Sequence, residues 1–341
     1  MIALEENVSL RAFNTFGIGV TARYFCRVHS EADILALIQH PIYKQHPVLI
    51  LGGGSNLLLV RPFEGLVVKN ELLGIDVVRE TDDWIELKIG AGENWHALVM
   101  HCVERNWGGI ENLSLIPGTV GAAPMQNIGA YGVEVKEVIK EVAAFDRQTG
   151  AKHTFNNEAC AFGYRESVFK QQLKEKFFIS SVTLTLTKKN HRINTQYGAI
   201  QHTLSEMEIT SPSLKDVSKA VMKIRTSKLP DPAHIGNAGS FFKNPSISKS
   251  QYESLLQAYP TIPGYVSENQ YVKVPAGWLI EQCGWKGKRW NDAGVHAQQA
   301  LVLVNYGHAQ GHEIFSLAQH IQTSVKKKFD IDLSMEVNVV G

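Results

Sequence analysis

Residues 116–132 read Ile-Pro-Gly-Thr-Val-Gly-Ala-Ala-Pro-Met-Gln-Asn-Ile-Gly-Ala-Tyr-Gly, a dense run of small residues. Small residues let main-chain amides approach a phosphate or a flat ring without intervening side chains. A second cluster, Gly52-Gly53-Gly54-Ser55-Asn56, directly follows the apolar run 48–51. Neither cluster ends in the Gly-Lys-Ser/Thr of a P-loop, and position 57, where the dinucleotide fingerprint needs a glycine, is Leu57. Two such clusters beside strand-like sequence favour a bound dinucleotide over a pair of tight structural turns.

Composition limits the class of protein. A chain of 341 residues suggests two or three domains. Its net charge of +1 gives no global field that would attract nucleic acid or an anionic membrane. No apolar run approaches the roughly 20 residues of a membrane-spanning helix, and the start lacks the features of a secretion signal. Four widely spaced cysteines fit reduced thiols better than disulfides or a metal site. We therefore expect a soluble, cytoplasmic protein without a bound metal.

Periodicity predicts a mixed order of helices and strands. The first ~70 residues read as strand, helix, strand, with Ser30 and Asp33 as a capping box and buried strands at 48–51 and 66–68. Residues 72–190 are mostly β, as at 84–89 and 177–186, interrupted by a helix with apolar positions between Trp95 and Val103.

A helix over 214–225 precedes Pro230 and Pro232, which mark a domain boundary because two prolines within three residues break regular structure. Beyond it the pattern predicts a helix at 276–283, a strand at 300–304, an amphipathic helix from Ile314 to Phe329 and an alternating strand at 335–340.

Self-contained catalytic motifs are missing from the chain. His312-Glu313 lacks the second histidine of a zinc-protease motif, since position 316 is serine, and there is no Gly-x-Ser-x-Gly elbow. A redox cofactor that supplies the difficult chemistry would account for this. Three residues remain as candidates, each with a structural alternative: Ser240 as a turn serine, Arg165 as a surface arginine, Glu336 as a solvated strand carboxylate.

Nearly end to end, the chain resembles the UDP-N-acetylenolpyruvoylglucosamine reductases, flavoenzymes of bacterial peptidoglycan precursor synthesis and thus of cell-wall biogenesis. The resemblance rests on blocks in the right order: Asn14-Thr15-Phe16-Gly17, residues 52–58 and 116–132, Gly163-Tyr164-Arg165-Glu166-Ser167, residues 238–245 and 276–280, and Glu336. It implies an α+β protein with a two-subdomain FAD-binding module of the vanillyl-alcohol-oxidase (PCMH) type and a smaller α+β substrate-binding domain. The implied domains are 1–70 joined by the terminal strand 330–341, then 71–228, then 229–329.

The resemblance also implies a reaction. NADPH would reduce a non-covalent FAD, whose N5 would pass a hydride to C3 of UDP-N-acetylglucosamine enolpyruvate, giving UDP-N-acetylmuramate. Such a step needs a proton donor to C2 and electrophiles around the adjacent carboxylate. The family pattern makes Ser240 the proton donor, with Arg165 and Glu336 flanking the carboxylate.

Positions that match the family's binding residues fall into two sets. The FAD positions are Gly52, Gly53, Gly54, Ser55, Asn56, Leu57, Pro117, Gly118, Thr119, Gly121, Ala122, Gln126, Asn127, Gly129, Ala130 and Gly132. The UDP-sugar positions are Tyr197, Lys228, Asn244, Tyr265, Lys286 and Gln299. Either lysine suits a diphosphate as a point charge, and either could equally be a solvated surface lysine.

One segment departs from the family pattern. The form with a substrate-covering loop (type I) usually carries an upstream tryptophan and Tyr-Gly-Pro-Leu, whereas this chain has Gln196-Tyr197-Gly198-Ala199-Ile200. Because the tyrosine is retained, we assign the loop-bearing form.

Other functions predict different observations. A second FAD oxidoreductase of the same fold, acting on an alcohol or lactone, would need no proton donor and no NADPH. A nucleotide-sugar-binding protein or transferase would be colourless, because it would bind no flavin. A scaffold protein is not supported by the sequence, which shows no coiled-coil heptads and no charged tail. We expect a monomer whose partners are the UDP-sugar and NADPH, with no nucleic acid or membrane.

Overall fold

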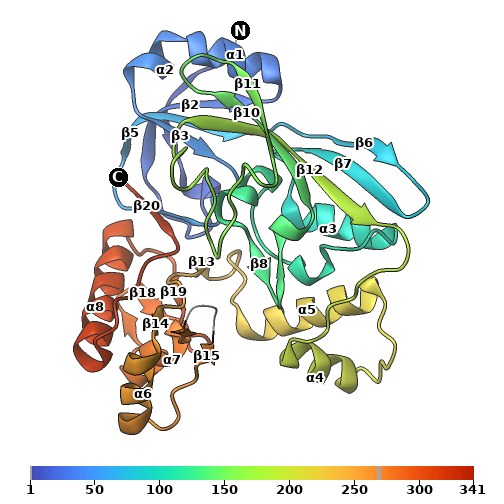
Figure 1. Ribbon diagram of the computed structural model, residues 1–341. Coiled ribbons are helices and arrows are strands. Elements are labelled where there is room, and N and C mark those ends of the chain that lie inside the picture. The colour runs from blue at the N-terminus through green and yellow to red at the C-terminus, as the bar shows by residue number, and fades with distance from the viewer. Residues whose placement is uncertain (1, 267–269) are drawn as a thin grey trace. The chain divides into compact units, whose positions relative to one another are not determined.

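The computed structural model describes residues 2–266 and 270–341, which form two compact units (Figure 1). The first unit comprises Met1–Val8, Ala22–Gly53 and Glu64–Ser227. The second comprises Ser9–Thr21, Gly54–Phe63 and Lys228–Gly341. Two early segments of the chain are therefore part of the unit that is otherwise built from the C-terminal third. The further division of the first unit at residue 70 remains a prediction.

The first unit contains a four-stranded sheet in the order β1-β2-β5-β3. Its elements and the helices that follow β2 are β1 (Glu5–Ser9), β2 (Thr21–Val28), α1 (Glu31–Gln39), α2 (Pro41–Gln45), β3 (Val48–Leu51) and β5 (Phe63–Asn70). Strands β3 and β5 are parallel, with Leu51 opposite Lys69. The predicted capping box is confirmed: the Ser30 side chain accepts from the Asp33 N–H, and Asp33 accepts from the Ser30 N–H.

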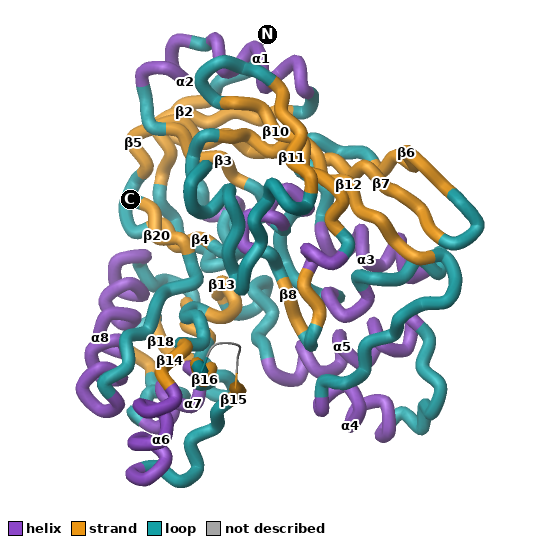
Figure 2. The backbone as a smooth tube through the Cα atoms, in the orientation of Figure 1, coloured by secondary structure: helices purple, strands orange, loops and turns teal. Residues whose placement is uncertain are grey.

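The first unit also contains a five-stranded antiparallel sheet, order β11-β10-β12-β7-β6 (Figure 2). Its strands are β6 (Ile75–Glu80), β7 (Trp84–Gly90), β10 (Ile139–Asp146), β11 (Lys152–Asn156) and β12 (Phe177–Thr187). Helix α3 (Trp95–Glu104) buries the predicted apolar face, including Trp95 and Val99, in one core with β7, β10 and β12. The strand predictions at 84–89 and 177–186 are confirmed.

Short elements complete the first unit. They are the hairpin β8 (Gly129–Ala130) and β9 (Val133–Glu134), the helices α4 (Gly198–Glu206) and α5 (Leu214–Lys228), and 3-10 turns that include η2 (Glu111–Leu113), η3 (Val120–Ala122) and η4 (Pro124–Gln126). The helix predicted at 214–225 is confirmed and continues to Lys228. It packs with α4 around Ile200, Val217 and Val221.

The second unit has two small sheets, β13-β19-β18-β17 and β14-β16-β15, and a parallel pair of β20 with β4. Its strands are β4 (Leu57–Leu59), β13 (Gly236–Ser240), β14 (Ser246–Ser248), β15 (Tyr265–Val266), β16 (Tyr271–Lys273), β17 (Arg289–Trp290), β18 (Ala293–Val295), β19 (Val302–Asn305) and β20 (Asn338–Val340). Its helices are α6 (Lys249–Ala258), α7 (Ala276–Gln282) and α8 (Gly311–Phe329). As predicted, α8 buries a stripe from Ile314 to Phe329.

Two strand predictions need correction. The strand expected at 335–340 is β20 at Asn338–Val340 only, because the chain changes partner at this point. The Glu336 N–H donates to the Phe241 carbonyl, whereas the Asn338 N–H donates to the Asn56 carbonyl. The strand expected at 300–304 begins at Val302, after a turn closed by a bond from the Val302 N–H to the Gln299 carbonyl.

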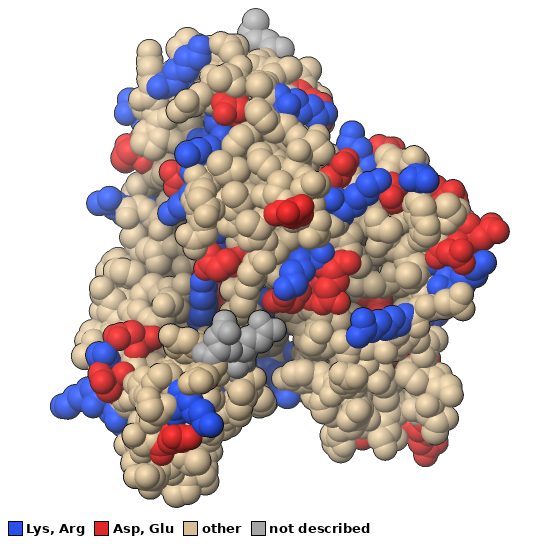
Figure 3. Space-filling view, in the orientation of Figure 1, with Lys and Arg blue, Asp and Glu red and all other residues tan. Residues whose placement is uncertain are grey.

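Charge is mixed over the face of the molecule shown in Figure 3, where Lys and Arg alternate with Asp and Glu. This agrees with the net charge of +1. Within residues 2–266 and 270–341, no helix combines the length and apolar character needed to cross a membrane. Cys26, Cys102 and Cys160 are buried free thiols, and burial raises the pKa of each to about 12.

Candidate functional site

The two glycine clusters touch each other in the first unit. A Cβ added to Gly53 would lie 2.7 Å from the Cα of Gly118, and one added to Gly52 would collide with the Thr119 hydroxyl. Such separations are too short for any side chain larger than hydrogen. Residues far apart in the sequence, which we predicted to bind one cofactor, thus pack against each other at backbone distance.

The second cluster is held in place by the start of α3. The Trp95 N–H donates to the Gly118 carbonyl (3.1 Å), and the Val120 N–H donates to the Glu93 carbonyl (2.9 Å). A Cβ on Gly121 would lie 2.6 Å from that of Ala91. The backbone from 118 to 121 is therefore fixed before any ligand binds.

The remainder of the first cluster belongs to the second unit. Gly54 has φ 62°, and a Cβ there would strike the Phe13 carbonyl oxygen. The Gly54 carbonyl accepts from the Thr15 N–H (3.1 Å). Buried Asn14 supports this segment, since its amide donates to the carbonyls of Leu10 and Ile18. The Asn-Thr-Phe-Gly block thus shapes the backbone around Gly54.

Arg165 sits on a tight turn that is tied to residues 125–129. Its φ of 56° is left-handed, and Gly163 and Glu166 exchange backbone hydrogen bonds across the turn. Its guanidinium donates to the carbonyls of Gly129 (2.6 Å) and Asn127 (3.4 Å). These bonds hold the fork at a defined position, as a carboxylate-binding arginine requires.

Asn127, a predicted FAD-binding residue, also stabilises the local fold through its side-chain hydrogen bonds. Its side chain is fully buried, donates to the Gly163 carbonyl (3.0 Å) and accepts from the Lys136 N–H (3.1 Å). Its φ of 44° is one that asparagine tolerates better than most residues. Asn127 therefore joins the Arg165 turn to the small-residue segment.

The β8–β9 hairpin carries the last predicted cofactor positions. Tyr131 and Gly132 have φ of 51° and 81°, as a two-residue type I′ turn requires. The Tyr131 ring packs edge-on against Tyr197, with centroids 5.3 Å apart. Burial raises the pKa of the Tyr131 phenol and lowers the pKa of Arg225, which is its hydrogen-bond partner.

Ser240 ends β13 next to an irregularity in the ladder. The register with β19 shifts between Asn237 and Ser240, and Gly239 has φ 68°. The Asn237 side chain fixes this bulge because it accepts from the Gly239 N–H (2.9 Å) and donates to the carbonyls of Pro230 and Ile235. Ser240 itself is exposed, while the following Phe241 and Phe242 are buried. A bulge of this kind re-aims the next side chain.

Glu336 lies beside Ser240 in the second unit. Its N–H donates to the Phe241 carbonyl (2.8 Å), and its own carbonyl accepts from the Asn56 amide (3.2 Å). The structure thus brings together the backbones of Glu336, the Ser240 segment and the predicted FAD residue Asn56. Arg165 belongs to the first unit.

The predicted UDP-sugar residues are spread over both units. Asn244 accepts from the Ala276 N–H (2.9 Å), which caps α7, and Gln299 lies 3.2 Å from the Cβ position of Gly277 in the same helix. Lys286 forms an ion pair with Glu281 of α7 (3.0 Å). These three residues therefore surround one short helix.

The remaining three lie on other elements. Tyr265 is 64% exposed on β15, Lys228 is exposed at the end of α5, and Tyr197 is 50% exposed before α4. The Tyr197 segment is held through Asn194, whose carbonyl accepts from the buried Asn112 amide (2.9 Å) and whose own amide donates to the Gly132 carbonyl (3.1 Å).

Sequence reasoning missed the residues that hold the site. Lys69 and Asn194 donate to the carbonyls of the predicted site residues Gly52 and Gly132. Asn112 and Asn237 bond to Tyr131 and Gly239, which are direct neighbours of predicted site residues. Of these four, Asn237 alone had a sequence signal, because it directly precedes the block at residues 238–245. The others are single polar residues in ordinary surroundings.

Two protein families match separate parts of the chain. Residues 22–155 match the family described as "FAD binding domain", and residues 231–340 match "UDP-N-acetylenolpyruvoylglucosamine reductase, C-terminal domain". Proteins named UDP-N-acetylenolpyruvoylglucosamine reductase are 48% identical in Flavobacterium johnsoniae and 50% identical in Amoebophilus asiaticus, over 99% of both chains in each case. The one from Chromobacterium violaceum is 51% identical over 98% of both chains.

Structural comparison supports the fold. The crystal structure of UDP-N-acetylenolpyruvylglucosamine reductase from Thermus caldophilus covers 100% of both chains with a TM-score of 0.68 and 23% identity. The predicted fold class, α+β with an FAD-binding module and a smaller C-terminal domain, is confirmed. Because its sequence is 48–51% identical to these reductases over nearly the full length, the chain belongs to the UDP-N-acetylenolpyruvoylglucosamine reductase family.

Proposed function

We propose that this chain reduces UDP-N-acetylglucosamine enolpyruvate to UDP-N-acetylmuramate, using NADPH as reductant and FAD as the intermediate carrier. Identity of 48–51% to reductases of that name over essentially the whole chain carries this proposal. The chain is an oxidoreductase of a family that uses FAD and NADPH. The reaction forms a precursor of peptidoglycan, and we place it in the cytoplasm, where it would support wall growth, cell shape and division.

Two backbone features of the first unit support FAD as the bound cofactor. The loop at 52–53 and the segment at 118–121 present backbone at distances that exclude side chains. Among the described residues, the Gly53 N–H has no protein acceptor, so it is available to an anionic group. When bound, FAD would take a hydride from NADPH and deliver one from N5 to C3 of the substrate.

Residues of the chain would donate the proton that C2 receives and stabilise the negative charge that forms on the substrate. Hydride addition at C3 leaves negative charge at C2 and on the adjacent carboxylate. The Arg165 guanidinium, fixed by the Gly129 and Asn127 carbonyls, would bind this carboxylate, and Glu336 would flank it. The Ser240 hydroxyl would then donate its proton to C2, and the resulting alkoxide would be reprotonated from solvent.

The nucleotide half of the substrate would bind around α7 and the Tyr197 segment. Asn244 and Gln299 meet the first residues of α7, where amide side chains suit hydrogen bonds to a sugar or uracil. Lys228 and Lys286 would approach the diphosphate as point charges, which for Lys286 requires exchange of its Glu281 partner. Tyr265 and Tyr197 supply exposed rings.

The organisation into domains follows the same proposal. Residues 1–70 and 71–228 would form the two FAD-binding subdomains, and 229–329 the substrate-binding domain, with a monomer as the active species. Light scattering of the purified protein measures the mass against the 37.9 kDa of one chain.

An anaerobic absorbance experiment tests the function. NADPH is added to the purified flavin-loaded protein, followed by UDP-N-acetylglucosamine enolpyruvate. We expect the flavin band near ~450 nm to bleach with NADPH and to recover with the enolpyruvyl substrate.

Bleaching without recovery would support a flavin reductase that acts on a different substrate. Rapid oxygen consumption with alcohols or lactones and no need for NADPH would favour the alternative oxidoreductase, and a protein that stays colourless with FAD would overturn the proposal.

A further inference from the structure

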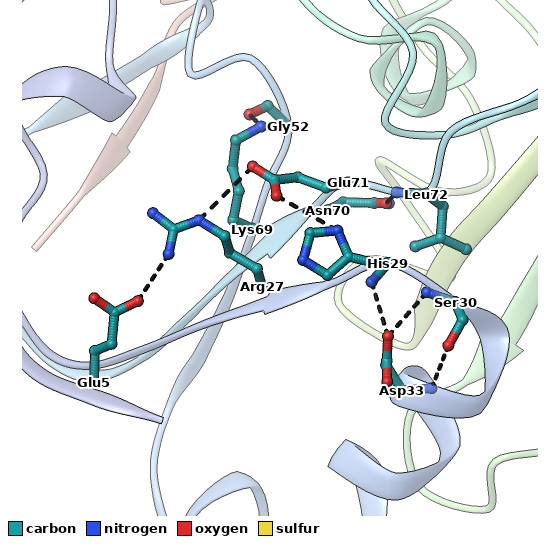
Figure 4. A network of polar contacts seen from close by, with 10 residues as sticks. All are labelled: Glu5, Arg27, His29, Ser30, Asp33, Gly52, Lys69, Asn70, Glu71 and Leu72. Atoms are coloured by element: carbon teal, nitrogen blue, oxygen red, sulfur yellow. Dashed lines mark hydrogen bonds and ion pairs between the residues drawn. The ribbon is translucent and has the colours of Figure 1, made fainter. Parts of the chain in front are cut away.

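A lysine stands beside the first glycine cluster. Lys69 lies on β5 in register with Leu51, the residue that precedes Gly52. Figure 4 shows its side chain running to the loop, where Nζ donates to the Gly52 carbonyl oxygen at 2.9 Å. Because parallel strands β3 and β5 end at the same edge, position 69 is suited to reach this loop.

Among the described residues, Lys69 forms no ion pair, and its ammonium makes one hydrogen bond, to the Gly52 carbonyl. The nearby Glu71 carboxylate faces Arg27 (3.9 Å) and His29 (3.7 Å) instead. Lys69 is half-buried, and burial lowers its pKa, with Arg27 acting in the same direction and Glu71 against it. An ammonium has three donors, so further acceptors can be bound.

The bond to Gly52 orients a peptide group. All described peptide bonds are trans, so the Gly52 carbonyl and the Gly53 N–H point in opposite directions across one plane. With the carbonyl drawn toward Lys69, the Gly53 N–H points away from it. That N–H has no acceptor within residues 2–266 and 270–341, and the contact of Gly53 with Gly118 limits rotation of the backbone.

We propose that Lys69 is a positioning residue for the diphosphate of FAD, an inference that rests on the proposed function. By its hydrogen bond, Lys69 keeps the Gly52 carbonyl oxygen pointing away from the diphosphate. The N–H of Gly53, on the other side of the same peptide group, can then donate to a diphosphate oxygen. Lys69 also places one positive charge at this end of the cofactor. Without Lys69 the Gly52 carbonyl loses the hydrogen bond that holds it turned from the phosphate, so the orientation of this peptide group is less well fixed.

FAD titration of the apoprotein, followed by flavin fluorescence, tests this inference. For Lys69→Met we expect the FAD dissociation constant to rise about tenfold or more. Lys69→Arg retains the charge and the donor and should recover most of the affinity. The matched control is Lys152→Met, which removes one charge from an exposed lysine paired with Glu31 and should leave FAD affinity within about twofold.

Two further measurements separate positioning from general stability. The unfolding temperature of apo Lys69→Met should stay close to that of the unsubstituted apoprotein, while the rise on adding FAD should be smaller. In the unsubstituted chain, FAD should slow hydrogen exchange of the Gly53 amide. This second readout holds even where the methionine variant fails to fold.

Three results would overturn the inference: unchanged FAD affinity in Lys69→Met, an equal loss in Lys152→Met, or Gly53 exchange that FAD does not slow. Each would leave the proposed function intact if the unsubstituted protein still binds FAD and is reoxidised by the enolpyruvyl substrate. Failure of the unsubstituted protein to bind FAD would instead overturn both.

Discussion

The backbone N–H of Glu336 donates to the carbonyl oxygen of Phe241 at 2.8 Å, which ties the candidate carboxylate to the residue directly after Ser240. Residues almost a hundred positions apart are thereby coupled through main chain, and the coupling does not depend on either side chain. Substitution of Ser240 should therefore leave the local backbone intact.

For Ser240→Ala we expect the rate of reoxidation by the enolpyruvyl substrate to fall about 10²–10⁴-fold, since a positioned general acid contributes that much. Flavin reduction by NADPH should be unchanged. Stopped-flow absorbance measures the two half-reactions separately. Ser246→Ala, at an exposed serine of β14, is the control. An equal fall in both half-reactions would assign Ser240 a structural role.

Gly53→Ala should weaken FAD binding and lower the free energy of unfolding by about 1–3 kcal/mol, because the new methyl group would overlap Gly118. The control is Gly198→Ala at the start of α4, where an added Cβ meets nothing within 4 Å. That change should be neutral or stabilise by about 0.4–1 kcal/mol. Denaturant melts and FAD titration measure both effects, and normal FAD affinity in Gly53→Ala would contradict the assignment of this loop.

Asn194→Ala should release the Tyr197 segment, because it removes the bond to the Gly132 carbonyl and the acceptor for the Gln196 N–H. We expect KM for the UDP-sugar to rise about three- to tenfold, with flavin reduction by NADPH unaffected. Steady-state kinetics with each substrate varied measures this. Gln201→Ala, at an exposed position of α4, should change neither parameter.

Because the pKa of the Asp33 carboxyl is lowered in the folded protein, we expect the free energy of unfolding to depend on pH. This pKa is lowered first by the hydrogen bond from the His29 N–H and further by Ser30. A carboxyl whose folded pKa is depressed stabilises above its unfolded pKa and loses that contribution as the pH falls through the folded value. Asp33→Asn should therefore be less stable by about 0.5–1 kcal/mol at pH 7.

This difference from the unsubstituted chain should begin to narrow as the pH falls below the unfolded pKa of aspartate, about 4, and should disappear once the pH has passed the lower pKa of folded Asp33. Denaturant melts from neutral to acidic pH measure it. The control is Asp82→Asn at an exposed turn. A difference that stays constant over this pH range would contradict the assignment.

Local signals allowed most elements to be predicted. The α1 capping box, the α8 stripe from Ile314 to Phe329 and the apolar face of α3 each show in a short window, and each is observed. The glycine clusters were recognisable because close backbone approach excludes side chains, as Gly53 against Gly118 demonstrates. Roles of individual residues came from the family resemblance, and they stay predictions.

Features that depend on distant partners could not be predicted. The terminal strand was expected to start at 335, yet the chain first pairs with Phe241 and only then with Asn56. Periodicity is blind to such a change of partner, because the alternation of side chains continues through it. Asn112 and Asn194 were missed for a similar reason, since single asparagines reveal their acceptors only after folding.

The pairing of β4 with β20 has a consequence for biosynthesis. Leu57–Leu59 is translated well before its strand partner Asn338–Val340, which follows much later in the sequence. Until that partner has been synthesised, three consecutive leucines, all buried in the folded protein, lack the strand with which they pair. The β4–β20 pair can form only after residue 340 has been synthesised, so until then the nascent chain exposes an apolar segment, and exposed apolar segments promote aggregation.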